Sequence, residues 1–536
     1  MTHGMVSAAQ PEAVEAGLET LKAGGNAVDA AVATALVQTV VDPQMCGIAG
    51  FGSLHVYAPQ KGLHECLDFH GRAPLAVTPE MWEHLLVGES EDGFGFQLEG
   101  RVNEIGYGAI TSPMTLRALD EALGRYGTRR IGDLMVPAIH YAEQGFMVRP
   151  HVAAYWNQVP TEGRAPHSEF LTAVPATRRI YAKPDGTLRR IGETLRNPDM
   201  AATLRLVRER GVAEFYEGSI AARIVADMKA HGGLIGEADL QGARPEVNAP
   251  LWGTYRGLDI ATNRPPGGGL MLIEMLNILE HFDLAAMGHN SPDYIATVAE
   301  AMKIATVDKD TKVGDPRFVA VPLDELTSKA YAAPLAERIR RGEKTSVPRL
   351  KAKGKESADT THVVAVDENG VIATMTHTLG TPSGVVTEGL GFMYNGAMAV
   401  FDPRPGRPGS LAPGKSRFSS LAPSILFRDG KPFLALGAPG GTYIAMGILQ
   451  VILNVVEFGM TASEAVAAPR FNATSDTLDI TNRILRATEA ELVRRGYPVR
   501  RWPMNFHFAG VHAIRMVDGR LDGGADPGRD GMAMAV

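Results

Sequence analysis

The strongest constraint on the fold is a change of pattern at Thr360. Before this residue, predicted helices alternate with loops, apart from one predicted hairpin formed by residues 53–57 and 63–69. After it come two strand pairs, joined by the turns Asp367-Glu-Asn-Gly370 and Arg428-Asp-Gly-Lys431. Glycine-bearing turns between two such strands are typical of β-hairpins and predict antiparallel sheets. The chain therefore combines predicted helices with predicted antiparallel strands, which is the content of an α+β protein. The predicted helices are residues 12–23, 27–40, 114–126, 131–145, 199–211, 219–231, 270–282, 294–307 and the apolar run that ends near 458.

Thr360 opens the first of these strands, in the run Ala358-Asp-Thr-Thr-His362. A threonine hydroxyl needs a base before it can act as a nucleophile, and one way to supply the base is to make the threonine an N-terminus. Its free α-amine, with an ordinary pKa of about 7.7–8.0, then accepts the hydroxyl proton near neutral pH. An ordinary strand residue is the alternative, because threonine is common in strands.

A chain break before Thr360 requires accessible chain. Residues 342–359 are polar, contain several lysines and show no periodicity, so we expect an exposed linker there. Such a segment can be cut without unravelling a core.

Two glycine clusters have different interpretations. The cluster from Gly47 to Gly52 precedes a predicted strand instead of linking a strand to a helix, which argues against a dinucleotide-binding loop. Pro439-Gly440-Gly441 joins a predicted strand to an apolar helix, and bare backbone N–H groups at such a turn suit a developing oxyanion. The alternative is steric: the glycines allow a tight turn and nothing more.

Composition argues against several function classes. The net charge of −7 argues against nucleic acid or an anionic membrane as the main partner. Cys46 and Cys66 are too few for a disulfide framework and are expected as buried free thiols.

The histidines show no metal-ligand spacing, so we expect no metal and no cofactor. No apolar run reaches the roughly 18 residues of a membrane span and the start is unlike a signal peptide, so we expect a cytoplasmic protein.

The sequence resembles the γ-glutamyltranspeptidases, members of the N-terminal-nucleophile (Ntn) hydrolases, nearly from end to end. The resembling segments of the N-terminal part are Glu15-Ala-Gly17, 24–31, Val41-Asp-Pro43, 47–52, Asp68-Phe69, Ala73-Pro74, 265–269, 276–279 and Gly314-Asp-Pro316. Those of the C-terminal part are Thr360-Thr-His362, Ser419-Ser420, Pro439-Gly-Gly441 and 468–471.

The resemblance implies a four-layer αββα sandwich built from one self-cleaving precursor. The large subunit would be residues 1–359 and the small subunit residues 360–536, with the cut between Asp359 and Thr360. Position by position, the implied functional residues are the nucleophile Thr360, the orienting Thr378, the oxyanion-hole glycines Gly440 and Gly441, and the carboxylate-binding Ser419 and Ser420.

The chain departs from the family where the α-amino and α-carboxyl groups of a substrate are bound. The arginine expected after Asp68-Phe69 is replaced by His70, with Arg72 two residues further on. The asparagine two residues after the second threonine is Gly380, and the two residues that bind the α-ammonium fall at Ala397 and Val400. A lost charge-assisted hydrogen bond costs about 1.5–3 kcal/mol of recognition.

We therefore expect an amidohydrolase for a small acyl group that bears a carboxylate but no α-ammonium, with Arg72 or His70 as further carboxylate ligands. Family members of this kind include oxamate amidohydrolases and glutaryl-cephalosporin acylases, and a cytoplasmic location favours an oxamate-like substrate. Hydrolysis or transfer of γ-glutamyl groups, from glutathione or other amides, is the second hypothesis. A catalytically inactive binding or assembly protein is the third. Besides the small-molecule amide, the expected partners are the two subunits themselves; a homodimer of heterodimers is left open.

Overall fold

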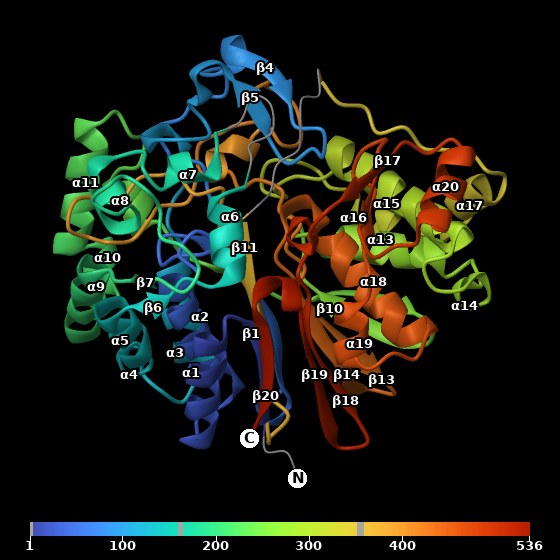
Figure 1. Ribbon diagram of the computed structural model, residues 1–536, viewed down its shortest axis with the longest axis horizontal. Helices are drawn as coiled ribbons and strands as arrows, with labels where there is room; N and C mark the ends of the chain where they lie inside the picture. The colour runs from blue at the N-terminus through green and yellow to red at the C-terminus, as the bar shows by residue number, and fades with distance from the viewer. Residues whose placement is uncertain (1–3, 159–164, 351–358) are drawn as a thin grey trace.

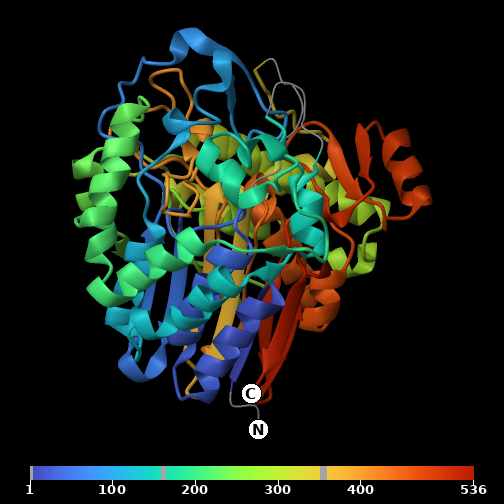
Figure 2. The same ribbon diagram turned by 60° about the vertical axis from the view of Figure 1, so that its left-hand side comes forward.

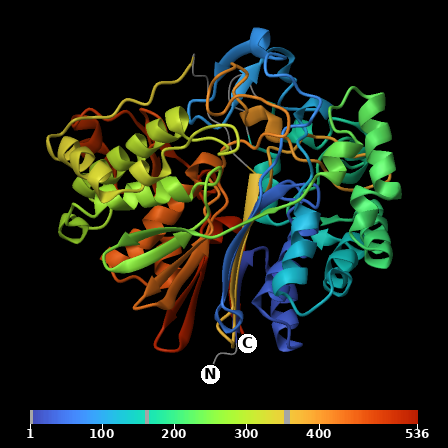
Figure 3. The same cartoon turned by 180° about the vertical axis from the view of Figure 1, so that it is seen from behind.

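Two antiparallel sheets stand face to face at the centre of the molecule. The computed structural model describes residues 4–158, 165–350 and 359–536, and Figures 1 and 3 show the two sheets nearly edge-on. The first sheet runs in the order β20 (Gly531–Ala535), β1 (Gly4–Ala9), β11 (Asp359–Asp367), β12 (Ile372–Gly380), β2 (Phe51–Ala58), β3 (Leu63–Phe69), β8 (Glu246–Asn248). The second runs β19 (Arg520–Ala525), β18 (His512–Val517), β14 (Lys431–Gly437), β13 (Ser424–Arg428), β10 (Leu258–Thr262), β9 (Leu251–Tyr255).

Helices cover the outer face of each sheet. The first sheet is covered by α1 (Pro11–Lys22), α2 (Ala27–Val41), α3 (Thr115–Tyr126), α4 (Ile131–Leu134), α5 (Val136–Gln144) and α9 (Pro198–Arg210), with α10 (Ala213–Tyr216), α11 (Ser219–Ala230) and α12 (Glu237–Gln241) beyond them. Figure 2 brings these helices in front of the strands. The second sheet is covered by α13 (Gly269–Leu279), α15 (Pro292–Lys312), α17 (Lys329–Arg340), α18 (Ile444–Glu457) and α19 (Ala462–Ala467).

Smaller elements complete the chain. They are α6 (Pro150–Trp156), α7 (His167–Phe170), α8 (Pro175–Tyr181), α14 (Leu284–Met287), α16 (Leu323–Leu326), α20 (Arg486–Arg494), β4 (Leu86–Glu89), β5 (Phe96–Leu98), β6 (Phe146–Met147), β7 (Thr194–Leu195), β15 (Phe471–Asn472), β16 (Leu478–Thr481) and β17 (Val499–Trp502). None of the described helices combines the length and the apolar character that crossing a membrane requires.

Three apolar cores separate the four layers. Successive side chains of a strand point to opposite faces, and β11 shows this alternation. Val363 and Ala365 pack in the core under the first helical layer, whereas Val364 and Val366 pack between the two sheets. A third core lies between the second sheet and its helices. Every residue of α2 is buried, as its apolar sequence predicts. The expected αββα sandwich is confirmed.

Each sheet combines strands from both sides of Thr360. In the first sheet, Val363 of β11 pairs with Ala8 of β1, and Met375 of β12 pairs with Leu54 of β2. In the second, Ile425 of β13 pairs with Ala261 of β10. Because these ladders and the cores are shared, residues before and after Thr360 do not form separate domains. A cut before Thr360 would leave the two pieces hydrogen-bonded to each other.

Most predicted elements are confirmed, and the differences have local causes. All three predicted hairpins form, and Cys46 and Cys66 are buried and free. The predicted helix 131–145 is divided into α4 and α5, with Pro137 in the first turn of α5. A proline lacks the N–H that would continue the preceding helix. Helix α15 continues past Val307 to Lys312, and Lys312 pairs with Asp308 one turn earlier.

The described part of the expected linker is mostly, but not entirely, exposed. Gly342 to Lys344 are exposed, but Val347 is buried and the side chain of Arg349 is 5% exposed. Ser346 and Pro348 are exposed as well, so the prediction of an exposed segment is wrong at Val347 and at the side chain of Arg349, which contacts hold against the protein. Its remaining part, 351–358, lies outside the described residues.

Candidate active site

A cavity of about 420 Å³ collects most of the predicted site residues. Its lining includes Thr360, Thr378, Ser419, Ser420 and Gly441, which come from well-separated parts of the sequence. The end of α15 and the loops around Phe94 and Arg404 complete its wall. This volume lies in the range of small-molecule sites.

Thr360 and Thr378 lie opposite each other on β11 and β12. The register that pairs Thr361 with His377 brings Thr360 level with Thr378, and a β-bulge follows between Thr361 and Asp359. The two hydroxyl oxygens are 3.1 Å apart and share a hydrogen bond. The backbone N–H of Gly380 donates to Thr378 Oγ1 at 2.7 Å. The hydroxyl oxygen of Thr378 thus has one hydrogen-bond partner in Thr360 and another in the backbone of Gly380.

His362 is not placed to act as the base. It follows Thr360 by two residues, but its ring nitrogens lie 2.8 Å from Thr376 Oγ1 and 3.0 Å from Thr374 Oγ1. Burial, together with the neighbouring His512 and His377, holds the pKa of His362 far below its ordinary value. Among the described residues no histidine lines the cavity.

Gly440 and Gly441 form the turn between β14 and α18. Both have positive φ, 136° and 57°, a conformation that side-chain-bearing residues rarely adopt. A Cβ on Gly440 would lie 2.7 Å from the backbone of Ala509. Gly441 lines the cavity, and neither backbone N–H donates to another described group. The turn needs glycine sterically, and it places Gly441 at the wall of the cavity that Thr360 also lines.

Ser419 and Ser420 are held by the segment Pro265–Gly269. The backbone N–H of Ser419 donates to Pro266 O at 2.7 Å. Gly268 lies so close to Ser420 that a Cβ would come within 2.5 Å of its backbone. Both serines are nearly buried, at 2% and 7% exposure. The proline- and glycine-rich segment therefore fixes this part of the cavity wall.

The cavity wall has more positive than negative side chains. Its basic residues are Lys309, Arg349, Arg404, Arg407 and Arg417, and its acidic residues are Glu89, Asp310 and Asp402. Arg404 binds Asp402 with two hydrogen bonds of 2.7 and 2.8 Å. The excess of positive charge favours an anionic ligand.

Arg417 is a site residue that sequence reasoning missed. Its guanidinium carbon lies 5.8 Å from the ring centre of Phe51 and 5.6 Å from that of Phe94. Phe51 pairs with Thr378 across β2 and β12, so Arg417 lies beside the end of the strand that carries Thr378. The one available signal was its position two residues before Ser419.

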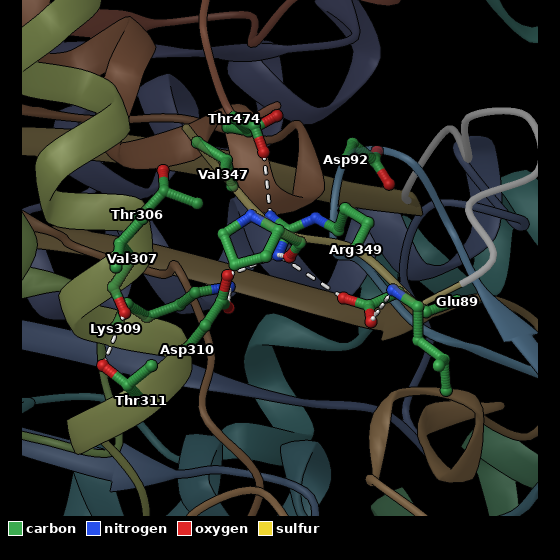
Figure 4. Close-up of polar contacts among 12 residues, drawn as sticks. Glu89, Asp92, Thr306, Val307, Lys309, Asp310, Thr311, Val347, Arg349 and Thr474 are labelled. Carbon is green, nitrogen blue, oxygen red and sulfur yellow. Dashed lines mark hydrogen bonds and ion pairs between the residues drawn. The ribbon is translucent and has the colours of Figure 1, made fainter. Parts of the chain in front are cut away.

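Arg349 was also missed, and it is the centre of a charged network in the wall (Figure 4). One guanidinium nitrogen lies 2.5 Å from Asp310 and 3.4 Å from Glu89. Burial raises the pKa of Glu89 above its ordinary value. Burial also acts to raise the pKa of Asp310, but Lys309 and Arg349 outweigh it and hold that pKa below its ordinary value.

His70 and Arg72 are placed differently from expectation. Neither is among the residues that line the cavity. His70 is 4% exposed, and its Nε2 lies 3.6 Å from Asp68. Arg72 binds Glu246 at 2.8 Å. The expected contact of these side chains with a substrate carboxylate is therefore corrected, because Arg72 is held by a carboxylate of the protein and His70 is buried beside Asp68.

No group of three or more His, Cys, Asp or Glu side chains suited to a metal occurs among the residues that the structure describes. The two positions that would hold an α-ammonium are apolar: Val400 lines the cavity, and Ala397 is buried and does not line it.

Known proteins resemble this chain over its whole length. A sequence model of the family described as Gamma-glutamyltranspeptidase matches residues 13–536. The Acylase ACY 1 proenzyme of Pseudomonas sp. (strain V22) is 37% identical over 100% of this chain and 94% of its own length. The Glutathione hydrolase proenzyme of Bacillus subtilis (strain 168) is 32% identical over 99% of this chain and 91% of its own. The crystal structure of cephalosporin acylase from Bacillus halodurans superposes with a TM-score of 0.87, at 30% identity, covering 99% of this chain and 96% of that one.

Proposed function

Since this chain belongs to the γ-glutamyltranspeptidase family of Ntn-type amidohydrolases, which mature by autocatalytic processing, we propose that its own cut falls between Asp359 and Thr360 and that Thr360 is the nucleophile. The observation that carries the proposal is the 3.1 Å hydrogen bond between the hydroxyls of Thr360 and Thr378 at the wall of the cavity. The pieces would be residues 1–359 and 360–536.

Self-cleavage would use the same hydroxyl as turnover. Thr360 Oγ1 attacks the carbonyl carbon of Asp359, the peptide C–N bond breaks, and the released amine takes up the proton, which leaves an ester. Water then hydrolyses the ester. The products are the carboxylate of Asp359 and the free amine and hydroxyl of Thr360.

In turnover, the free amine of Thr360 is the best available base. No described histidine lines the cavity, and its three acidic side chains each contact an arginine. The amine takes the hydroxyl proton as Oγ1 attacks the substrate amide, and it returns the proton to the leaving amine. The N–H groups of Gly440 and Gly441 stabilise the oxyanion, a contribution of about 2.7–4 kcal/mol per donor in other hydrolases. Water then resolves the acyl-enzyme.

The acyl group we propose carries a carboxylate and no α-ammonium. Ser419, Ser420 and Arg417 would bind the carboxylate, because all three line the cavity and serine hydroxyls and guanidinium both donate to carboxylate oxygens. An α-ammonium would need an acidic partner, yet Asp310 and Asp402 are already paired with Arg349 and Arg404, and Val400 is apolar.

Within this class we favour a longer dicarboxylic acyl amide over oxamate. Oxamate is among the smallest such amides and would leave most of a cavity of about 420 Å³ to water. A glutaryl-like chain spans from a carboxylate site to the nucleophile with apolar methylenes between. The acylase and cephalosporin acylase names of two relatives support an acyl amide as the class of substrate.

The second candidate is hydrolysis or transfer of γ-glutamyl groups. The glutathione hydrolase name of the B. subtilis relative favours it. The two candidates differ in one substituent of the acyl group, the α-ammonium, so matched substrates separate them.

The test compares turnover of three anilides, with oxamate as a fourth compound. Glutaryl anilide has the carboxylate alone, γ-glutamyl anilide adds the α-ammonium, and pentanoyl anilide lacks both. We expect kcat/KM for the glutaryl compound to exceed that of each of the others by about tenfold to over a hundredfold, the worth of one charge-assisted hydrogen bond. Preference for the γ-glutamyl compound would establish the second candidate instead.

A single band near 57.3 kDa on a denaturing gel, with no turnover, would indicate an inactive binding protein.

A further inference from the structure

The segment 345–350, which ends ten residues before Thr360, is attached to the protein at both ends. At its start, the backbone N–H of Thr345 donates to Glu300 of α15 at 2.6 Å. At its end, Leu350 exchanges two hydrogen bonds of 3.0 Å with Glu89, one from its N–H to the Glu89 carboxylate and one from the Glu89 N–H to its carbonyl. Glu89 and Glu300 both precede the proposed cut.

The same segment is also bound by residues that follow the proposed cut. Asp476 accepts hydrogen bonds from the N–H of Val347 at 2.8 Å and from the hydroxyl of Ser346 at 3.1 Å. Arg349 donates to the carbonyl oxygen of Thr474 at 2.8 Å. The segment therefore bridges the two pieces that self-cleavage would produce.

The contacts of the Arg349 side chain are the most enclosed of those that the segment makes. Figure 4 shows its guanidinium between Asp310 and Glu89, with Thr474 on a third side. Gly93 makes room for it, because a Cβ at that position would lie 2.5 Å from a guanidinium nitrogen. A buried ion pair of this kind contributes little net stability, but it fixes the position of the groups that it joins. Arg349, Leu350 and Thr360 all line the same cavity.

We infer that Arg349 and Asp476 are positioning residues for self-cleavage, which hold the chain ahead of the scissile bond and thereby restrict the orientation of the Asp359 carbonyl relative to Thr360 Oγ1. The inference rests on the proposed cut before Thr360. The two reacting groups belong to adjacent residues, so the rate depends on their relative orientation, and attack is fastest when that orientation is held. With Leu350 anchored, only residues 351–358 separate the anchored chain from β11.

The test follows self-cleavage of the full-length chain over time on a denaturing gel. The variants are Arg349→Ala, Arg349→Lys, Asp476→Ala and the control Arg341→Ala, whose side chain is 59% exposed and pairs with Glu343 nearby. We expect the first-order rate to fall about tenfold or more in Arg349→Ala and severalfold in Asp476→Ala. Arg349→Lys should be intermediate and Arg341→Ala unchanged.

Two further measurements distinguish positioning from folding. The thermal unfolding midpoint of uncut Asp476→Ala should stay near that of the uncut wild type. Once processed, this variant should turn over substrate at the wild-type rate, because Asp476 does not line the cavity. Asp476→Ala decides the question if Arg349→Ala fails to fold.

The inference is overturned if both variants cut at the wild-type rate, or if their slowing follows a lowered unfolding midpoint. Failure of the proposed function looks different, because the wild type itself would then remain uncut or yield a fragment that starts at a residue other than Thr360.

Discussion

The hydroxyl of Thr360 lies 3.1 Å from the hydroxyl of Thr378 on the neighbouring strand, and the N–H of Gly380 binds Thr378 from the other side. The pair is almost completely buried, at 3% and 2% exposure, yet both residues line the cavity. An enclosed hydroxyl with a fixed partner is pre-oriented for attack.

Replacing Thr360 tests the nucleophile. Thr360→Ala should remain a single chain and lose at least about 10³-fold in turnover, because removing a nucleophile leaves only binding and oxyanion stabilisation. Thr360→Ser should retain part of both activities, because it keeps a hydroxyl. Gel analysis and N-terminal sequencing of the small fragment check this prediction. A normally processed Thr360→Ala protein would refute the proposed mechanism.

Replacing Thr378 tests orientation. Thr378→Ala should slow self-cleavage and turnover by about 10–100-fold, and it should also lower stability by about 1–3 kcal/mol, because the buried N–H of Gly380 loses its acceptor. Thr378→Ser keeps the oxygen and should recover most of the rate. If Thr378→Ala and Thr378→Ser behave alike in kcat, the hydroxyl is not needed for orientation.

Arg417 and Arg72 form a matched pair for carboxylate binding. Arg417→Ala should lower kcat/KM for a glutaryl amide by about tenfold or more and leave the uncharged pentanoyl amide nearly unchanged. Arg72→Ala should change both by less than about threefold, because Arg72 is paired with Glu246 and does not line the cavity. The reverse pattern would indicate that Arg72, and not Arg417, binds the substrate carboxylate.

Acid should destabilise the fold through buried histidines. Burial lowers the pKa of His55, His377 and His512 to about 3 in the folded protein, whereas the unfolded chain titrates near 6.5. Between these values the unfolded state binds more protons, so stability is lost as the pH falls. Each histidine contributes up to about 1.4 kcal/mol per pH unit.

The acid effect can be measured on Thr360→Ala, which keeps the chain in one piece. The free energy of unfolding by urea should fall between pH 7 and pH 5. Adding His512→Phe, which keeps a ring at this fully buried site, should reduce the slope by about one proton. An unchanged slope would show that His512 does not titrate as its burial implies.

The local elements were predictable because their signals lie within a few residues of each other. The turn Asp367–Gly370 fixes the register of its hairpin, and that register alone brings Thr360 opposite Thr378. Glycines at 440 and 441 indicated a turn that only glycine tolerates, and the positive φ angles confirm it. The prediction of exposure failed at Arg349, because a polar composition does not reveal that its side chain is paired with Asp310 and Glu89.

The sequence by itself determined the hairpins, the apolar helices, the family and the identity of the candidate nucleophile, since these depend on periodicity, turn chemistry and ordered motifs. Only the tertiary structure decided which charged side chains meet at the cavity. Arg417 and Arg349 line it whereas Arg72 does not, although Arg72 lies close to the family motif Asp68-Phe69 and Arg349 lies in the predicted linker. The reason is physical: an arginine side chain is long, and its place depends on which carboxylates and rings other segments bring within its reach.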